Sequence, residues 1–212
     1  MTAPRSIAIV DDDEAVREST AALLSAAAFE VDLYDSGDAF LKNDLNSINC
    51  VLLDIRMPGT DGIEVLRQLG EMERYPPVVV LTGHGDVALA VEAMKLGAVD
   101  FLEKPYDPTL LLNTLNLSIR NHQSGHEKVQ PSEEALALIG RLSPRQREIL
   151  RGMLGGDSNK IMAWKLGLSI RTVEAHRAQM MARLQVRSIA EVIQIGLAAG
   201  LTSLDRTGPP PR

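Results

Sequence analysis

Cys50-Val51-Leu52-Leu53-Asp54 is the stretch that decides the fold: an apolar run that ends in a carboxylate. Such a run is typical of a strand buried on both faces of a parallel sheet. Three other strand-like runs, residues 7–10, 78–81 and 99–102, are also followed by polar side chains. These side chains are Asp11, Asp12, Asp13, Thr82 and Lys104. Because parallel strands place their carboxyl ends at one edge of an open sheet, we expect these groups to lie together there.

Strand and helix signals alternate regularly through the first half of the chain. Strands are expected near residues 6–10, 30–34, 49–54, 77–82 and 99–102. Helices are expected near residues 14–27, 36–44, 62–70, 86–96 and 107–122. This alternation predicts an α/β, doubly wound, five-stranded parallel sheet with helices on both faces.

The second half carries helix signals without strand signals. Helices are expected near residues 134–141, 144–154, 158–166, 170–184 and 189–199. Short helices with very short turns predict an all-α helix-turn-helix domain. The expected division is a first domain over residues 1–122, a linker over 123–137, a helical domain over 138–205 and a disordered tail over 206–212.

Charge differs between the two halves. Residues 1–122 carry 20 Asp and Glu against 9 Lys and Arg, a net charge of −11, whereas residues 123–212 carry a net charge of +5. An acidic half is compatible with a divalent cation and a basic half with DNA. No apolar run approaches the roughly 20 residues that span a bilayer, and no signal peptide is visible, so we expect a cytoplasmic protein without a membrane partner.

The polar groups at the strand ends fit a phosphoryl site. Mg²⁺ prefers oxygen ligands and usually keeps several waters, so Asp12 and Asp54 could ligate it directly and Asp11 through water. A carboxylate is also a competent nucleophile toward a phosphoryl group. Lys104 could neutralise the transferring group, and Thr82 could donate a hydrogen bond to it.

Four motifs resemble those of receiver domains in two-component response regulators. They are Val10-Asp11-Asp12-Asp13, Asp54-Ile55-Arg56-Met57-Pro58-Gly59, Leu81-Thr82-Gly83-His84-Gly85-Asp86 and Phe101-Leu102-Glu103-Lys104-Pro105. The resemblance spans roughly residues 5–122 and implies a flavodoxin-like fold. It implies that a sensor histidine kinase phosphorylates Asp54. It also implies that Asp11, Asp12, Asp54 and the backbone carbonyl of Arg56 surround Mg²⁺, and that the Lys104–Pro105 peptide is cis.

The same resemblance implies a switch. The phosphoryl oxygens would draw in the Thr82 hydroxyl, and Phe101 would turn into the space that this leaves. Phe101 has no hydroxyl, unlike the Tyr of other members, so only packing can report its state. The consequence is expected on the face of the helix 86–96 and the strand 99–102, where Val91 and Lys95 are our expected contacts in a homodimer of the phosphorylated protein.

The helical half resembles the LuxR/NarL/FixJ-type DNA-binding domain over roughly residues 138–200, and the whole chain most resembles FixJ-type regulators. The resemblance rests on the segments 142–150, 157–163 and 166–177. In the helix 170–184, Val173, Met180 and Leu184 recur at helical spacing and should pack inward. The outward positions, expected to face base edges of double-stranded DNA, are Arg171, Glu174, Ala175 and Ala178. The positions expected to contact phosphates are Asn159, Lys160, Thr172, Arg177 and Arg183.

These patterns predict a transcription regulator whose DNA binding is controlled by phosphorylation, and which catalyses only its own phosphotransfer and dephosphorylation. RNA polymerase is a candidate further partner. One alternative is a phosphatase of the haloacid-dehalogenase type, with Asp11 and Asp13 at the required spacing; it would give Asp54 no role. A second alternative is an output domain that binds a protein partner instead of DNA.

Overall fold

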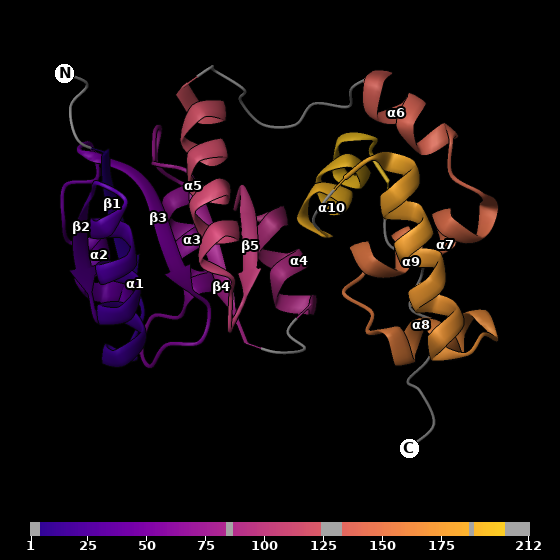
Figure 1. The fold of residues 1–212 in the computed structure, drawn as a ribbon, viewed down its shortest axis with the longest axis horizontal. Coiled ribbons are helices and arrows are strands. Elements are labelled where there is room, and N and C mark those ends of the chain that lie inside the picture. Colours follow the sequence, from indigo (N-terminus) through magenta and orange to yellow (C-terminus); the bar gives the residue numbers. More distant parts are fainter. Residues whose placement is uncertain (1–4, 84–86, 124–132, 187–188, 202–212) are drawn as a thin grey trace. The chain divides into compact units, whose positions relative to one another are not determined.

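The structure is a computed structural model, and it describes residues 5–83, 87–123, 133–186 and 189–201 (Figure 1). Contacts within the chain divide it into two compact units. One contains residues 1–84 and 96–127, and the other contains residues 85–95 and 128–212. The predicted tail and residues 124–132 of the predicted linker lie outside the described residues.

The first unit contains a five-stranded parallel sheet, as the sequence predicts. The strand order is β2-β1-β3-β4-β5, and each neighbouring pair is parallel. The strands are β1 (Arg5–Val10), β2 (Phe29–Tyr34), β3 (Ile48–Asp54), β4 (Val78–Thr82) and β5 (Asp100–Glu103). Helices α1 (Glu14–Ala26), α2 (Gly37–Leu41), α3 (Gly62–Gly70) and α5 (Pro108–Gln123) belong to the same unit. This arrangement confirms the predicted α/β fold.

The sheet is buried on both faces because alternate residues of its central strands point to opposite sides. On one face, strand residues such as Ile9 and Leu52 form a core with Leu24 of α1 and with Leu111 and Leu115 of α5. The intervening positions of β1 and β3 are also fully buried. Cys50 lies in this core as a free thiol, where it packs as a small buried hydrophobe.

Short connections follow the strands at their carboxyl ends. Asp13 caps α1, since its carboxylate accepts hydrogen bonds from the backbone N–H groups of Ala15 and Val16 at 2.9 and 3.2 Å. Asp61 caps α3 in the same way. Gly62, the first residue of α3, lies so close to β3 that a Cβ atom there would be 2.3 Å from the Asp54 carbonyl oxygen. Helix α3 therefore packs directly on the backbone of Asp54.

The second unit contains helices and no described strand. Its helices are α4 (Val87–Lys95), α6 (Glu133–Gly140), α7 (Pro144–Leu154), α8 (Asn159–Leu166), α9 (Ile170–Leu184) and α10 (Ile189–Ala198). Helix α6 begins within the predicted linker, so residues 133–137 are helical. The grouping of α4 with this unit was not expected from the sequence.

N-terminal caps and a glycine set the limits of α8 and α9. Ser158 caps α8, and Ser169 caps α9 by accepting a hydrogen bond from the Thr172 N–H at 3.1 Å. Between them, Gly167 ends α8 with a φ of 65°, a left-handed conformation that glycine adopts without a steric penalty. The two helices are thus joined by three residues, as in a helix-turn-helix unit.

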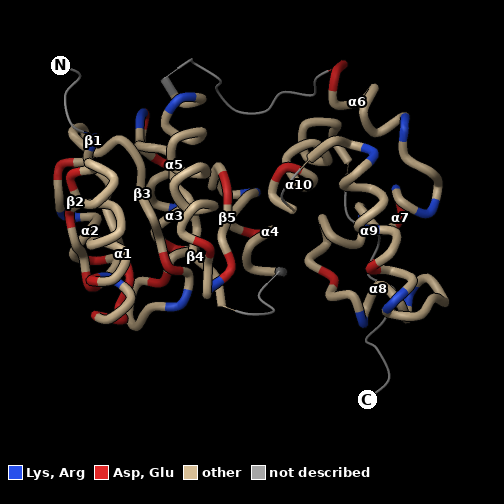
Figure 2. Tube along the Cα trace, in the orientation of Figure 1, with Lys and Arg blue, Asp and Glu red and all other residues tan. Residues whose placement is uncertain are grey.

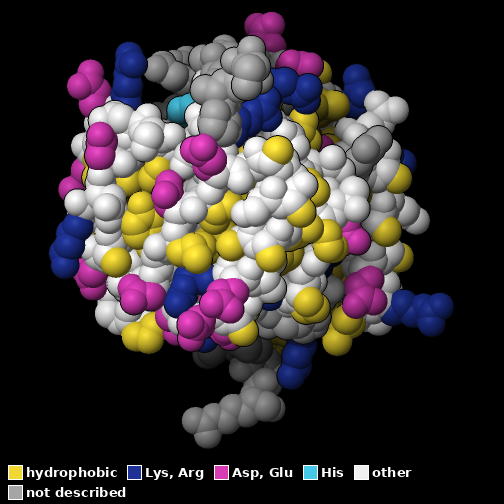
Figure 3. Space-filling model, turned by 60° about the vertical axis from the view of Figure 1, so that its left-hand side comes forward, with side chains coloured by type: hydrophobic (Ala, Val, Ile, Leu, Met, Phe, Trp, Pro, Cys, Tyr) yellow, Lys and Arg dark blue, Asp and Glu magenta, His cyan; other side chains and the backbone are white. Residues whose placement is uncertain are grey.

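Several large hydrophobic side chains are exposed at the surface. Leu33, Leu110, Leu117 and Trp164 are among them, each 44–48% exposed. Figure 3 shows one face of the molecule, on which hydrophobic side chains lie between acidic and basic ones. Single exposed apolar residues are normal for globular proteins. Among the residues that the structure describes, none of the helices has both the length and the apolar character that a membrane span requires.

Candidate functional site

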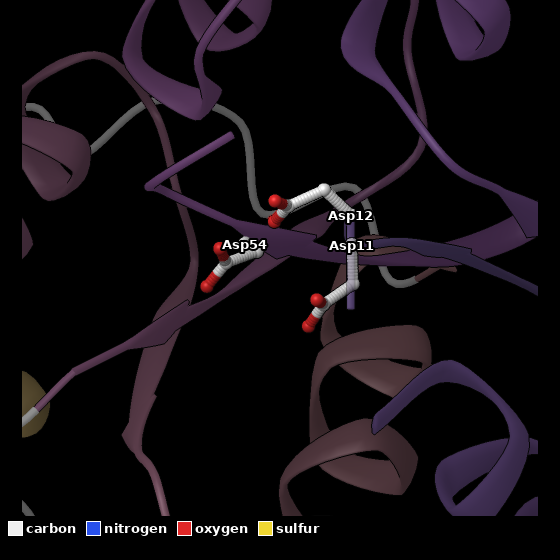
Figure 4. A group of neighbouring side chains, drawn as sticks. All are labelled: Asp11, Asp12 and Asp54. Carbon is white, nitrogen blue, oxygen red and sulfur yellow. The ribbon is translucent and has the colours of Figure 1, made fainter. Parts of the chain in front are cut away.

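Three carboxylates converge at the carboxyl ends of β1 and β3. Asp11, Asp12 and Asp54 each offer an oxygen within 4.8 Å of the others (Figure 4). Figure 2 shows this edge of the sheet as a gathering of acidic residues. Asp11 is fully buried and Asp54 is 6% exposed, whereas Asp12 is exposed. Three hard oxygen donors of this kind fit Mg²⁺, which needs only one or two carboxylates beside its waters.

Lys104 joins two of these acids. Its Nζ lies 2.6 Å from Oδ2 of Asp11 and 3.0 Å from Oδ1 of Asp54. The Lys104 N–H donates to the Thr82 carbonyl at 2.7 Å, which joins the backbone of Lys104 to the end of β4. The Lys104–Pro105 peptide is cis, as the resemblance implied. The cation therefore lies between the proposed nucleophile and the most buried acid, where a transferred phosphoryl group would need a positive charge.

Burial and charge shift two pKa values at this acidic site. Burial raises the pKa of Asp54; the hydrogen bond and charge of Lys104 oppose this, and the charges of Asp11 and Asp12 add to it. For Lys104, burial alone would lower the pKa, but its hydrogen bonds and ion pairs with Asp11 and Asp54 outweigh burial and raise it. The pKa of Asp54 is raised despite the ion pair because burial, its largest cause, disfavours the ionised carboxylate.

Other predicted residues also lie at this edge. Thr82 ends β4 and is buried, and Phe101 of β5 is half-buried next to Val80 in the sheet register. Arg56 lies two residues beyond the end of β3, with an exposed side chain. The structure thus brings Thr82 and Lys104 to the strand edge that carries the acids, while the inward turn of Phe101 stays a prediction.

Two side-chain contacts of α1 were missed from the sequence. Arg17 Nη1 of α1 donates to the backbone carbonyl of Asp11 at 2.6 Å. Tyr106 and Thr20 share a hydrogen bond of 2.7 Å. Because the single Thr20 hydroxyl proton goes to the Val16 carbonyl, Tyr106 must be the donor. No motif signalled these side chains, which come from α1 and the β5–α5 connection.

In the second unit, the inward and outward faces of α9 agree with the predicted pattern. Val173, Met180 and Leu184 are buried, which confirms the helical spacing. The predicted outward residues are all exposed: Arg171, Glu174, Ala175 and Ala178. Lys160 on α8 is exposed too. These side chains are accessible to a ligand such as a DNA duplex.

Other residues expected at DNA phosphates are engaged within the fold. Arg177 Nη1 donates to Oδ1 of Asn159 at 2.5 Å, and both side chains are half-buried. Burial lowers the pKa of Arg177, and the charge of Glu174 acts in the opposite direction. Arg183 is exposed but donates to the Arg141 carbonyl and to Gln146 Oε1 at 3.3 and 3.2 Å.

Three further predicted residues lie on α9 and α4. Thr172 is half-buried, and its hydroxyl lies 2.8 Å from that of the capping residue Ser169. On α4, Lys95 is exposed and Val91 is buried. In this conformation only Lys95 of the predicted dimer contacts is at the surface, and its Nζ donates to the Leu154 carbonyl at 2.7 Å. The dimer face stays a prediction.

Two family models match the chain. Residues 7–116 match the response regulator receiver domain, and residues 140–195 match the bacterial regulatory proteins of the luxR family. The matched segments contain the strand-end motifs and the helix-turn-helix, respectively.

Relatives match over almost the whole chain. The transcriptional regulatory protein FixJ of Bradyrhizobium diazoefficiens is 41% identical over 95% of this chain and 98% of its own length. FixJ of Rhizobium meliloti is 40% identical over 92% and 96%. Among solved structures, full-length FixJ from B. japonicum has a TM-score of 0.53 at 40% identity, with 92% of this chain and 97% of that chain covered. The response regulator StyR has a TM-score of 0.52 at 35% identity, with 91% and 98% covered.

Proposed function

The chain belongs to the two-component response regulators that join a receiver domain to a LuxR-type DNA-binding domain, and we propose that phosphorylation of Asp54 controls its binding to DNA. The named relatives are transcriptional regulators, and the chain is a regulator of this kind rather than an enzyme with a separate substrate. A receiver domain implies a histidine kinase as partner, and a LuxR-type domain implies DNA.

The observation that carries the proposal is the position of Lys104, in ion-pair distance of both Asp11 and Asp54. An Asp54 oxygen attacks the phosphorus of the donor while the bond from phosphorus to the kinase imidazole nitrogen breaks, and the imidazole leaves with the electron pair. Lys104 balances the charge on the phosphoryl oxygens, and Thr82 donates a hydrogen bond to one of them.

Asp12 and Asp54 are the proposed direct ligands of Mg²⁺, with the Arg56 carbonyl as a further ligand and Asp11 acting through water. The donor set of carboxylates and a carbonyl is the hard oxygen set that this ion prefers. When bound, the ion supplies positive charge beside the oxygens of the transferring group. The phosphatase alternative leaves Asp54 without a role, which its pairing with Lys104 argues against.

Phosphorylation is proposed to act through Phe101 and to favour a homodimer that reads paired half-sites. Lys95, exposed on α4, is the residue whose substitution tests this face. Lys95→Glu should lower the dimer fraction that light scattering detects in the phosphorylated protein. A wild-type protein that stays monomeric after phosphorylation would remove this part of the proposal. RNA polymerase is a further proposed partner of the bound dimer.

Asp54→Asn tests the phosphoacceptor. The variant should take no label from a small phosphodonor, acetyl phosphate, in the presence of Mg²⁺, because an amide cannot form the acyl phosphate. Asp44→Asn is the matched control, since Asp44 is exposed and lies in the connection from α2 to the amino end of β3, not at the carboxyl ends of the strands. Undiminished labelling of Asp54→Asn would show that another residue is the acceptor.

Mobility shift tests the output. The phosphorylated wild type should bind duplex DNA more tightly than the unphosphorylated protein, and Asp54→Asn should not respond to acetyl phosphate. No affinity for DNA at low salt in either state would instead support the alternative of an output domain that binds a protein.

A further inference from the structure

Arg177 and Asn159 form a contact that the sequence pattern did not indicate. Arg177 lies in the middle of α9, and Asn159 is the first residue of α8. The Arg177 Nη1 donates to Asn159 Oδ1 at 2.5 Å, across 18 positions of sequence. Both residues were expected to contact DNA phosphates, yet here each engages the other.

The surroundings of Arg177 differ from those of the exposed cations nearby. Arg177 is half-buried, whereas Lys160 and Arg171 are exposed. Burial of a guanidinium costs free energy unless its donors find acceptors, and the Asn159 carbonyl supplies one. The lowered pKa of Arg177 reflects this burial, although the group remains charged.

The contact completes the attachment of α8 to α9. At its carboxyl end, α8 is joined to α9 by Gly167 and the two residues that follow. At its amino end, where Ser158 caps the helix, the hydrogen bond from Arg177 ties Asn159 to α9. Two attachments at opposite ends fix the angle between two helices far better than one.

We infer that Arg177 is a positioning residue, which acts through Asn159 to hold α8 at a fixed angle to α9. Lys160, next to Asn159 on α8, is then presented to the DNA backbone, and Arg171, on α9, to the base edges, in one fixed arrangement. This inference rests on the proposed DNA binding. It keeps phosphate contact at Lys160 and removes it from Arg177.

Salt dependence separates the two roles. Each Lys or Arg that neutralises a DNA phosphate contributes about 0.9 to the slope of log K against log salt concentration. A positioning residue contributes to affinity without contributing to this slope. We therefore compare Arg177→Met, Asn159→Ala, the double variant and Lys160→Ala, each as the full chain treated with acetyl phosphate and Mg²⁺. The probes are a duplex that the wild type selects from a random pool and a duplex of random sequence, over a series of KCl concentrations.

Arg177→Met should weaken binding to the selected duplex roughly tenfold, the effect of losing a hydrogen bond to a charged group, and should leave the salt slope unchanged. Binding to the random duplex should weaken less. The double variant should bind as Arg177→Met does, because the two residues act as one unit. Lys160→Ala should lower the slope by about 0.9.

Three outcomes would overturn the inference. A slope lowered by about 0.9 in Arg177→Met would make Arg177 a phosphate contact. Additive losses in the double variant would make the two residues independent. A lower melting temperature with unchanged affinity of the folded protein would make the contact merely structural.

A second, milder variant keeps the inference testable if Arg177→Met does not fold. Arg177→Gln removes the charge but keeps an amide that can donate to Asn159, so it should retain more affinity than Arg177→Met, again with an unchanged slope. A lowered slope in this variant would refute the inference as well. If the wild type binds neither duplex, the proposed DNA binding fails, and the inference falls with it.

Discussion

Lys104 in the first unit and Lys160 in the second are both cations that we expect to meet phosphate oxygens, yet their surroundings are opposite. Lys104 has a side chain 24% exposed and lies between two buried carboxylates. Lys160 is exposed on the first turn of α8. At the acidic site, protein charges already balance the cation, so a phosphoryl group must compete with them. On α8, solvent and salt ions balance it, so its contribution to DNA binding should fall as salt rises.

The largest expected effect is on phosphorylation at the acidic site. Lys104→Met should slow labelling by acetyl phosphate roughly 100-fold or more, because it removes the charge that balances the phosphoryl oxygens. The loss should depend little on KCl, since a buried group is weakly screened. Lys42→Met, an exposed lysine after α2, is the control and should label at the wild-type rate. Normal labelling of Lys104→Met would show that the ion pair has no part in the chemistry.

The second unit also has a shielded ion pair, so burial alone does not distinguish the two units. Lys165 lies 2.8 Å from Asp157, and both side chains are about one-eighth exposed, at 12% and 13%. Lys165→Met leaves the Asp157 carboxylate unpaired and should lower the free energy of unfolding by about 2 kcal/mol, less than for a fully buried pair. Trp164, the only tryptophan, reports unfolding of this unit by fluorescence.

The control for that measurement is the exposed pair of Arg145 and Glu148, with side chains 50% and 38% exposed. Arg145→Met should change the unfolding free energy by less than about 0.5 kcal/mol, because water screens exposed pairs. Equal losses in Lys165→Met and Arg145→Met would mean that shielding from solvent does not set the strength of ion pairs in this unit.

A smaller effect is expected on the surface of α8. Lys160→Ala should weaken binding to the selected duplex about fivefold at low salt and reduce the salt slope by about 0.9. The difference from wild type should therefore shrink as KCl is raised. Lys42→Ala serves as the control. A Lys160→Ala loss that is equal at every salt concentration would mean that Lys160 is shielded from salt as Lys104 is, and would contradict the comparison.

The smallest expected effect concerns stability and pH. Burial raises the pKa of Asp54, so the stability that this group contributes is present below its unfolded pKa of about 4 and is lost as the pH rises through its folded pKa. Asp54→Asn cannot ionise. Without Mg²⁺, it should therefore melt a few degrees above the wild type at pH 7, and the gain should be smaller near pH 4. A gain that does not vary with pH would rule out the ionised carboxylate as its source.

The acidic site was predictable because parallel strands bring the residues at their carboxyl ends to one edge of the sheet, however the side chains pack. Asp11, Thr82 and Lys104 could be placed there from four runs of sequence alone. The Lys104–Pro105 cis peptide came from the resemblance rather than from physics. Arg17 and the Tyr106–Thr20 contact were missed because the first depends on side-chain reach from α1 and the second on packing between α1 and a loop.

On α9, the buried and outward positions were predictable from the sequence, but the intermediate ones were not. Helical spacing correctly separates Val173 from Arg171, because one faces the core and the other faces away from it. It cannot tell whether an intermediate position such as Arg177 is open or covered, since that depends on where α8 lies. The direction of Arg177 toward Asn159 needed the three-dimensional arrangement.

Gly62 limits how the receiver domain can be recombined with other receiver domains. There is no space for a side chain at this position beside the Asp54 carbonyl. A transplanted α3 that begins with any other residue would therefore displace the strand that carries the phosphoacceptor. Chimeras of receiver domains should therefore be joined after Gly62 rather than before it. In a library of such chimeras, those that keep glycine at this position should still be phosphorylated, and those with another residue there should not.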